Sequence, residues 1–382
     1  MSVSGNGVTE PGAYLFSGNE AVVEGAIMAG CRFYAGYPIT QSTGVVEGMS
    51  RRMSDAGGTY LQMEDEMGSM SALMGASWGG AKAMTATSGL GFSLMQEHIG
   101  FAVMAETPLV IVDVMRCGPA IGVVAEPMQG DVMQANWGHN GSIGVIALAP
   151  ASVQECFDLT IESFNLAEKY RTPVILLSDA RLANLREKVS VPPVDSVDIT
   201  SRKVAQKGEK KFFLAADGVA PMPLLGDGHR VIVACSSHDE HGDIRMTAQN
   251  HRTLVDKLTN KLALASREST KIETGFMDDA DVAVLSYGIT SRGVESAVKR
   301  ARGEGLKVGY VRLISIWPFN EAEVKRALGR AKDVIVVELN KGQILNEVRR
   351  ALGGEKQTHL VWDIGQLVPP DVIYDKIRQV IR

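Results

Sequence analysis

The sequence predicts an α/β protein with a doubly wound, mostly parallel sheet in the first part of the chain and a smaller α/β domain after it. The chain has 382 residues, more than a single hydrophobic core usually organises. Apolar runs such as LVIVDVM at 109–115 are typical of strands buried on both faces of a parallel sheet. Such runs alternate with segments of helical periodicity, and this alternation favours the doubly wound class.

Each element of the first domain follows from a local pattern. Apolar residues at helical spacing predict helices, continuous aliphatic and β-branched runs predict strands, and clustered glycines predict a turn. In chain order we expect a helix at 20–29, a strand at 32–36, a helix at 67–78, a strand at 83–87, a glycine-rich turn at 88–92, a helix at 94–104, strands at 109–115 and 145–149, a helix at 153–170 and a strand at 174–178.

The composition changes near residue 186. Proline, glycine and paired lysines up to residue 230 predict an irregular connection, and the charged segment 246–270 predicts an exposed helix. A second alternating run follows, with strands at 281–287, 307–313 and 334–338 and helices at 292–301 and after Pro318. We therefore expect a first domain at 1–200, an irregular linker with an exposed helix at 201–275, and a second domain at 276–382.

Charge and composition exclude several classes of function. The net charge is −5 and no basic tract is present, which argues against a nucleic-acid partner. No apolar run reaches the roughly 18–20 residues of a membrane span, and the first residues lack the pattern of a signal peptide. We expect a cytoplasmic protein without a membrane partner.

The cysteines and histidines do not predict a metal centre on this chain. Cys31, Cys117, Cys156 and Cys235 are scattered without a C-x-x-C pair, so we expect reduced thiols. Any iron–sulfur cluster that the function requires must belong to another polypeptide. His238 and His241 flank Asp-Glu in a polar loop, but no third ligand is evident, and no metal is assigned.

Glu66 is the most informative candidate for a catalytic residue. It opens a predicted helix rich in small residues, including Gly68, Ala72 and Gly75. A carboxylate in this position suits thiamine diphosphate chemistry, where it hydrogen-bonds the aminopyrimidine ring and favours its imino tautomer, while small residues let a flat ring approach the backbone. The alternative is an ordinary acidic residue that interacts with the dipole of the helix.

A set of short motifs extends over nearly the whole chain. The motifs are Tyr-Pro-Ile-Thr at 37–40, Glu-Asp-Glu at 64–66, Thr-Ala-Thr-Ser-Gly at 85–89, Leu-Met-Gln-Glu at 94–97, Arg116, Asn-Leu-Ala-Glu-Lys-Tyr-Arg-Thr-Pro at 165–173, Trp-Pro-Phe-Asn at 317–320 and Val-Glu-Leu-Asn-Lys-Gly-Gln at 337–343. In this order and spacing the chain resembles the α subunit of a 2-oxoacid:ferredoxin oxidoreductase of the 2-oxoglutarate synthase-like group.

The resemblance implies a fold, a reaction and a division of labour. The first domain resembles the pyrimidine-binding module of thiamine diphosphate enzymes, and the second resembles the C-terminal domain of transketolases. The implied reaction is the coenzyme A-dependent oxidative decarboxylation of a 2-oxoacid to acyl-CoA and CO₂, or the reverse carboxylation, with ferredoxin as the electron partner. Thiamine diphosphate would be shared with a β subunit that carries Mg²⁺ and a [4Fe–4S] cluster; γ and ferredoxin-like δ subunits are further candidate partners.

This chain fits that division, because it lacks the usual diphosphate and Mg²⁺ signature. Gly-Asp-Gly at 226–228 is not followed by paired asparagines, and we interpret it as a turn. The active site is therefore expected at a subunit interface.

The resemblance also implies roles for single residues. Glu66 aligns with the cofactor-activating glutamate of the family. Arg116 ends a strand at the edge where α/β sheets present ligand groups, and its planar fork suits the carboxylate of the 2-oxoacid. Thr40 and Tyr37 are expected to bind the substrate from the opposite turn. The alternatives are a surface charge for Arg116 and a turn-forming hydroxyl for Thr40.

Departures from the family pattern concern the choice of substrate. Gln41 replaces the second proline of Tyr-Pro-Ile-Thr-Pro, and Ala120 and Ile121 replace two hydroxyl residues. Glu126 lies near a position where many members carry a basic residue, and there an acid would repel a distal carboxylate. These changes favour an apolar or aromatic 2-oxoacid. The alternative is 2-oxoglutarate, with Lys341 or a β-subunit residue binding the distal carboxylate.

Two other classes of function stay open at this point. A pyruvate dehydrogenase β-like or transketolase-type subunit would share the glutamate and the C-terminal domain, but would not be expected to carry Tyr-Pro-Ile-Thr. A scaffold without catalytic function is disfavoured because Glu66 and Arg116 are both present.

Overall fold

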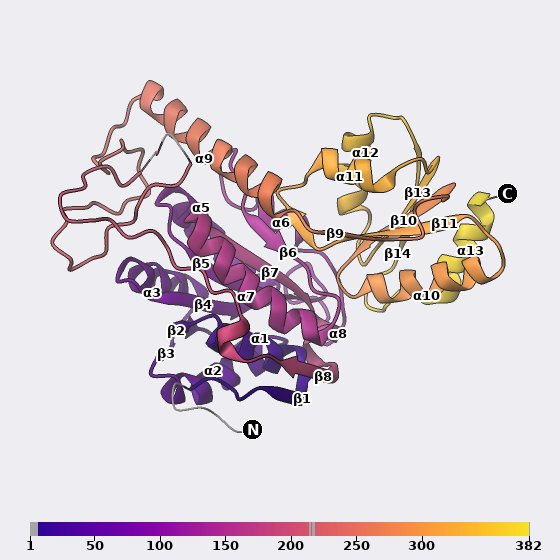
Figure 1. Ribbon diagram of the computed structural model, residues 1–382, viewed down its shortest axis with the longest axis horizontal. Helices are drawn as coiled ribbons and strands as arrows, with labels where there is room; N and C mark the ends of the chain where they lie inside the picture. Colours follow the sequence, from indigo (N-terminus) through magenta and orange to yellow (C-terminus); the bar gives the residue numbers. More distant parts are fainter. Residues whose placement is uncertain (1–6, 214, 216–217, 382) are drawn as a thin grey trace.

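The computed structural model describes residues 7–213, 215 and 218–381, and it contains two main sheets (Figure 1). The larger sheet has seven strands in the order β12-β6-β7-β5-β4-β2-β3. Its strands are β2 Cys31–Gly36, β3 Thr59–Gln62, β4 Lys82–Thr87, β5 Leu109–Met115, β6 Ile146–Leu148, β7 Pro173–Asp179 and β12 Ser315–Trp317. Every pairing in this sheet is parallel except that of β12 with β6.

Helices separate the successive parallel strands of this sheet. They are α1 Gly18–Met28, α2 Thr43–Asp55, α3 Glu66–Trp78, α4 Leu90–Leu94, α5 Gln96–Met104, α6 Val132–Trp137, α7 Val153–Tyr170 and α8 Ala180–Asn184. Helix α1 packs against α7, and α3 packs against α5. The arrangement confirms the predicted doubly wound α/β class. A separate antiparallel pair, β1 Gly12–Ser17 and β8 Arg186–Val191, lies at the edge of this part of the molecule.

The second sheet has five strands in the order β14-β13-β10-β11-β9. Its elements are β9 Ile272–Gly275, β10 Val282–Tyr287, α10 Thr290–Gly303, β11 Val308–Leu313, α11 Glu321–Leu328, β13 Asp333–Glu338, α12 Gln343–Leu352, β14 Gln357–Trp362 and α13 Pro370–Ile381. Strand β12 follows β11 in the chain but pairs with β6 of the larger sheet. The chain therefore returns from the smaller sheet to the edge of the larger one before it continues to α11.

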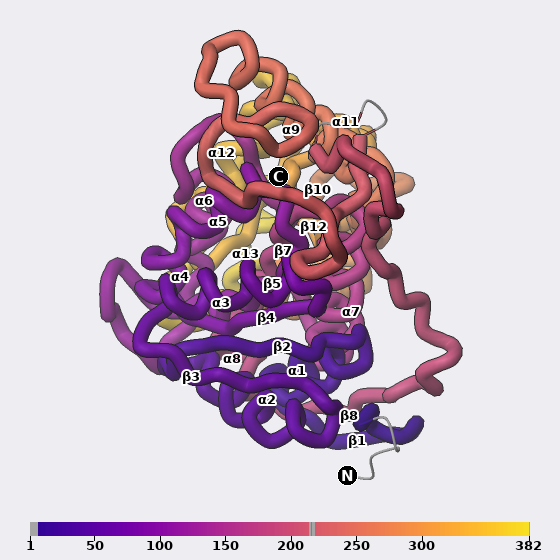
Figure 2. Tube along the Cα trace, turned by 90° about the vertical axis from the view of Figure 1, so that its left-hand side faces the viewer, coloured from indigo at the N-terminus to yellow at the C-terminus, as the bar shows by residue number. Residues whose placement is uncertain are grey.

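The segment between the two sheets has little regular structure, as expected. After β8 and the short 3-10 turn η1 Val194–Ser196, the chain runs along the outside of the molecule before it enters helix α9 Ala248–Ser269 (Figure 2). Buried ion pairs hold this region in place. Arg202 contacts Glu168 at 2.5 Å, and Lys261 of α9 contacts Glu106 at 2.7 Å. Helix α9 was expected to be exposed, but one of its faces is buried, Lys261 included.

Among the helices of the described residues, none combines the length and the hydrophobicity required to cross a lipid bilayer.

The four cysteines are free thiols, and three of them are buried. Burial raises the pKa of the Cys31 thiol to about 12, so that group stays protonated and unreactive near neutral pH.

Candidate active site

Glu66 is the first residue of helix α3 and is 3% exposed. The preceding residue, Asp65, has an extended backbone, and its side chain accepts a hydrogen bond from the backbone N–H of Gly68 at 2.7 Å. Asp65 therefore caps the helix, which leaves the Glu66 carboxylate free for another partner. Burial raises the pKa of Glu66, and the neighbouring charge of Asp65 raises it further.

The predicted glycine-rich turn forms one wall beside Glu66. A β-carbon added to Gly91 would lie 2.2 Å from Glu66 Oε1 and 2.3 Å from Thr87 Oγ1. A side chain at residue 91 is therefore incompatible with the present position of the carboxylate. The turn is shorter than expected, because Leu90–Leu94 forms the short helix α4. Ser88 fastens it to β5 by donating a hydrogen bond to the carbonyl oxygen of Val114 at 2.7 Å.

The same turn also lies against Arg116, through Gly89, which is two residues before Gly91. Gly89 has φ +56°, and a β-carbon on it would lie 3.4 Å from Arg116 Nε. Arg116 follows the carboxyl end of β5 and is 4% exposed, so it is not a surface charge. One short segment, Gly89–Gly91, therefore lies against Arg116 at one end and against Glu66 at the other.

The Tyr-Pro-Ile-Thr turn meets Arg116 through its backbone. Arg116 Nη1 donates a hydrogen bond to the carbonyl oxygen of Thr40 at 3.1 Å, while Thr40 itself is exposed. Tyr37 is 41% exposed on the same turn. Gln41 adopts φ +90°, a backbone conformation that proline cannot take, because its ring fixes φ near −65°. The replacement of proline by Gln41 thus fits the backbone of this turn.

An open cavity of about 290 Å³ adjoins Arg116. Ala120, Met128 and Asp131 also line it, together with Ser93 and Gln134. Gln134 donates a hydrogen bond to the Ser93 hydroxyl at 2.9 Å. Ile121, which was grouped with Ala120 in the sequence, is 66% exposed.

Glu126 is paired with a cation that the sequence did not reveal. Its Oε2 lies 2.6 Å from Nη2 of Arg181, which belongs to α8. Because the two opposite charges lie so close together, their fields largely cancel for a group farther away. Glu126 therefore does not present an isolated negative charge. Lys341, the alternative candidate for a distal carboxylate, lies with Nζ 5.1 Å from the centroid of the Trp362 ring.

The second sheet fixes the segment that follows Arg116. The buried amide of Gln129 accepts from the backbone N–H of Leu339 at 3.0 Å, and Asn340 donates to the carbonyl oxygen of Gln129 at 2.8 Å. Trp317 donates to the carbonyl oxygen of Val132 at 2.7 Å. The motifs at 317–320 and 337–343 therefore position the loop between Arg116 and α6, a function that their sequence did not reveal.

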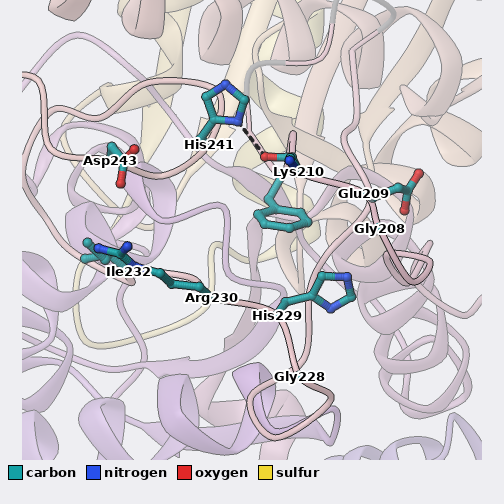
Figure 3. Close-up of a pocket in the computed structure, with 10 residues that line it drawn as sticks. Gly208, Glu209, Lys210, Gly228, His229, Arg230, Ile232, His241 and Asp243 are labelled. Atoms are coloured by element: carbon teal, nitrogen blue, oxygen red, sulfur yellow. Dashed lines mark hydrogen bonds between the residues drawn. The ribbon is translucent and has the colours of Figure 1, made fainter.

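A cavity of about 560 Å³ lies elsewhere, in the irregular segment (Figure 3). His241 Nδ1 lies 2.7 Å from the carbonyl oxygen of Lys210, and Asp227 contacts His229 at 2.8 Å. Asp227 also accepts from the backbone N–H of Leu224, which confirms that Gly-Asp-Gly at 226–228 is a turn. In the described part of the chain, no group of three metal-ligating side chains is present.

The surroundings of Glu66 can be compared with the thiamine diphosphate that was expected. The buried carboxylate of Glu66 has a raised pKa and lies against the backbone of Gly91, and the buried hydroxyls of Thr85 and Thr87 have no hydrogen-bond partner. These features fit the pyrimidine side of that cofactor.

Sequence reasoning missed Asp113 and Asp131 near Arg116. The signal for Asp113 was a lone carboxylate inside an apolar strand.

Residues 24–257 match the family described as pyruvate flavodoxin/ferredoxin oxidoreductase, thiamine diphosphate-binding, and residues 280–371 match core domain II of pyruvate:ferredoxin oxidoreductase. The chain is 47% identical over 369 residues to 2-oxoglutarate synthase subunit KorA of Methanothermobacter marburgensis, covering 95% of this chain and 98% of the relative. It is 34% identical to ketoisovalerate oxidoreductase subunit VorB of Methanothermobacter thermautotrophicus, covering 96% and 97%.

A solved structure of 2-oxoglutarate:ferredoxin oxidoreductase from Magnetococcus marinus, with 2-oxoglutarate, coenzyme A and succinyl-CoA bound, superposes with a TM-score of 0.93 at 32% identity. The likeness covers 97% of this chain and 65% of the solved one, so this chain spans about two thirds of that protein's length.

Proposed function

The chain belongs to the 2-oxoacid:ferredoxin oxidoreductase family as an α-type subunit, and from that premise we propose that it supplies the pyrimidine-binding half of a shared active site. The supporting observation is the Gly89–Gly91 segment, which lies against both Arg116 and Glu66. A carboxylate that activates the cofactor and a cation that binds the substrate are thereby held on one wall. Membership of this family also excludes the pyruvate dehydrogenase and transketolase alternatives.

Glu66 is proposed to bind the aminopyrimidine ring of thiamine diphosphate. The cofactor supplies the electron sink for decarboxylation when it is bound. Glu66 contributes a buried carboxylate with a raised pKa, which suits it to holding a proton at Oε1 or Oε2 against a ring nitrogen. Because Gly91 has no side chain, the carboxylate can lie directly against the backbone there.

Arg116 is proposed to bind the carboxylate of the 2-oxoacid, with the Thr40 hydroxyl and Tyr37 beside it. The guanidinium is buried, and its Nε has no hydrogen-bond partner. An unpaired donor of this kind is costly in the free protein and favours an incoming anion. Mg²⁺ and the iron–sulfur clusters are assigned to partner subunits, with ferredoxin as electron acceptor.

The proposed substrate is 2-oxoglutarate. Four relatives named 2-oxoglutarate synthase are 39–48% identical to this chain, whereas one named 2-oxoglutarate oxidoreductase and those named for ketoisovalerate are 34% identical. The expected preference for an apolar acid rested on Ala120, Ile121 and repulsion by Glu126, and the ion pair with Arg181 weakens the last of these arguments. The comparisons therefore favour the alternative over the apolar preference.

We predict that the natively purified complex prefers 2-oxoglutarate. A charge-assisted contact with the distal carboxylate contributes about 1.5–3 kcal/mol, so kcat/KM should exceed that for 2-oxoisovalerate and phenylpyruvate by roughly 10- to 100-fold. The measurement is coenzyme A-dependent reduction of a viologen dye across these acids. Equal or higher kcat/KM for the branched or aromatic acids would contradict the proposal.

The Glu126–Arg181 pair offers a second prediction on the same panel. In Arg181→Met the Glu126 charge is uncompensated, and its repulsion should raise KM for 2-oxoglutarate by about two- to fivefold, the range of an exposed ion pair. KM for 2-oxoisovalerate, which lacks a distal charge, should not change. The double variant Glu126→Gln/Arg181→Met is the control and should restore the original KM. A rise that affects both acids equally would show that the pair has only a structural role.

The close contact at Gly91 gives a third prediction. In Gly91→Ala the added methyl group must displace Glu66 or Thr87, so we expect a loss of about 1–3 kcal/mol in the free energy of unfolding and a fall in turnover of about 10²-fold. Gly75→Ala on the same helix as Glu66 is the control, because nothing lies within 4 Å of its added β-carbon. Chemical denaturation and dye reduction by the assembled complex would measure both effects. Normal turnover in Gly91→Ala would contradict the placement of Glu66.

A further inference from the structure

Asp113 is a charged residue in the interior of an apolar strand. It lies in β5, where all seven residues are buried, and it is 0% exposed. Its neighbours across the sheet are Thr87 of β4 and Leu177 of β7, neither of which carries a charge. Neither carboxylate oxygen receives a hydrogen bond of ordinary geometry, and the nearest backbone donor is the N–H of Gly89. An isolated ionised carboxylate in such a place is strongly disfavoured.

A second carboxyl group faces Asp113. Asp131 precedes helix α6, and its side chain lies within hydrogen-bonding reach of the Asp113 carboxyl. Its Oδ2 is also buried without a partner. Two ionised carboxylates are acceptors only and repel each other, whereas a single proton between them turns the contact into a strong hydrogen bond. A shared proton therefore accounts for the unpartnered oxygens of both residues.

The charge that both carboxyl groups face is Arg116. Two charged groups affect the pKa of Asp113, namely Arg116 and Asp131. The pKa of Asp131 is in turn affected by Arg116 and Asp113. Burial raises the pKa of Asp113 well above its ordinary value, and the charge of Asp131 raises it further; burial also raises the pKa of Asp131 to about 6. Near neutral pH the pair therefore holds one proton and one negative charge, which balances the guanidinium.

We propose that the Asp113–Asp131 pair is a positioning group for Arg116, sharing one proton in the free enzyme and taking up a second when a substrate carboxylate binds to Arg116. Asp131 and Arg116 line the same cavity, so a carboxylate bound there brings a further negative charge close to the pair. The inference rests on the proposed role of Arg116. It adds that the aspartate pair takes up a proton when the substrate carboxylate binds to Arg116.

The direction of the pH dependence follows from the charges. A bound anion raises the pKa of the pair above its value in the free enzyme, so binding favours the protonated pair. Affinity for the 2-oxoacid is then highest below the free pKa, near 6 for Asp131, and falls as the pH rises through the pKa values of the free and bound states. The fall is at most about tenfold per pH unit for one proton.

The test uses the assembled complex carrying Glu66→Gln, so that 2-oxoglutarate binds without reacting. Isothermal titration calorimetry in two buffers of different ionisation enthalpy measures the protons taken up on binding. We expect uptake of up to one proton per site, largest at a pH between the free pKa near 6 and the higher pKa of the bound state, and its loss when Asp131→Asn is added. In Asp131→Asn the buried Asp113 keeps its proton and the asparagine does not titrate, so affinity should become independent of pH across this range.

A purely structural role would give a different result, with weaker binding by the same factor at every pH and unchanged proton uptake in Asp131→Asn. That result, or binding without proton uptake in the complex that lacks this substitution, would overturn the proposal. Infrared spectroscopy gives a readout that does not depend on the substrate. Part of the carbonyl-stretch signal of protonated carboxylic acids at pH 7 should be present in the unsubstituted complex and lost in Asp113→Asn.

The two readouts separate the inference from the proposed function. If 2-oxoglutarate does not bind at any pH, the proposed substrate and the linkage both fail, while the infrared signal still decides the shared proton. If 2-oxoglutarate binds and is turned over but the infrared signal is missing, the proposed function stands and the shared proton is refuted.

Discussion

Replacing Glu66 by glutamine is expected to lower the rate of 2-oxoacid decarboxylation by roughly 10²- to 10⁴-fold, the usual contribution of a positioned acid–base group. Glutamine has nearly the same shape, so it should keep the packing against Gly91 and the start of helix α3. It cannot accept or release a proton at the pyrimidine ring. Assembly with the partner subunits should therefore persist while the chemistry is lost.

The direct measurement is exchange of the C2 proton of thiamine diphosphate bound to the assembled complex, followed in deuterated water. Slow exchange in Glu66→Gln would support the role of Glu66. Glu64→Gln is the matched control, because Glu64 lies two residues earlier and is exposed. Exchange as rapid in Glu66→Gln as in the unsubstituted complex would contradict this account of the site.

The second large effect is expected for Arg116→Ala. Loss of one partner of a buried charge pair costs about 2–5 kcal/mol, so kcat/KM for the 2-oxoacid should fall by roughly 30-fold to several thousandfold, with a raised KM. Arg116→Lys keeps the charge but loses the planar fork, and it should recover only part of the activity. Arg51→Ala, at an exposed arginine of α2, should leave the kinetics unchanged. Unchanged kinetics in Arg116→Ala would remove Arg116 from the site.

Strong local patterns were sufficient to predict part of the fold. The strand at 109–115 was placed to the residue, because seven buried positions in succession leave a clear apolar run. The helix at 153–170 was placed equally well, because Ser152 caps its beginning and Arg171 in the left-handed region ends it. Glu66 at the start of α3 was also predicted, since a helix-opening acid is visible in a single sequence.

Features that depend on distant contacts could not be predicted. Strand β12 joins the larger sheet although it follows β11 of the smaller one, and no local pattern distinguishes these two sheets. The Glu126–Arg181 ion pair connects residues 55 positions apart, so no local pattern indicates that the charge of Glu126 is paired. Asp113 and Asp131 have no significance singly, and only the folded chain brings their carboxyl groups together beside Arg116.

The central claim is that this chain holds one half of an active site whose other half belongs to a partner subunit. The most direct test is a mixing experiment with separately purified chains, which measures viologen reduction dependent on 2-oxoglutarate, coenzyme A and thiamine diphosphate. We predict no activity from this chain alone or from its co-purifying partners alone, full activity from the mixture, and none when the mixed chain carries Glu66→Gln. Activity of the partners without this chain, or of the mixture with Glu66→Gln, would contradict the account.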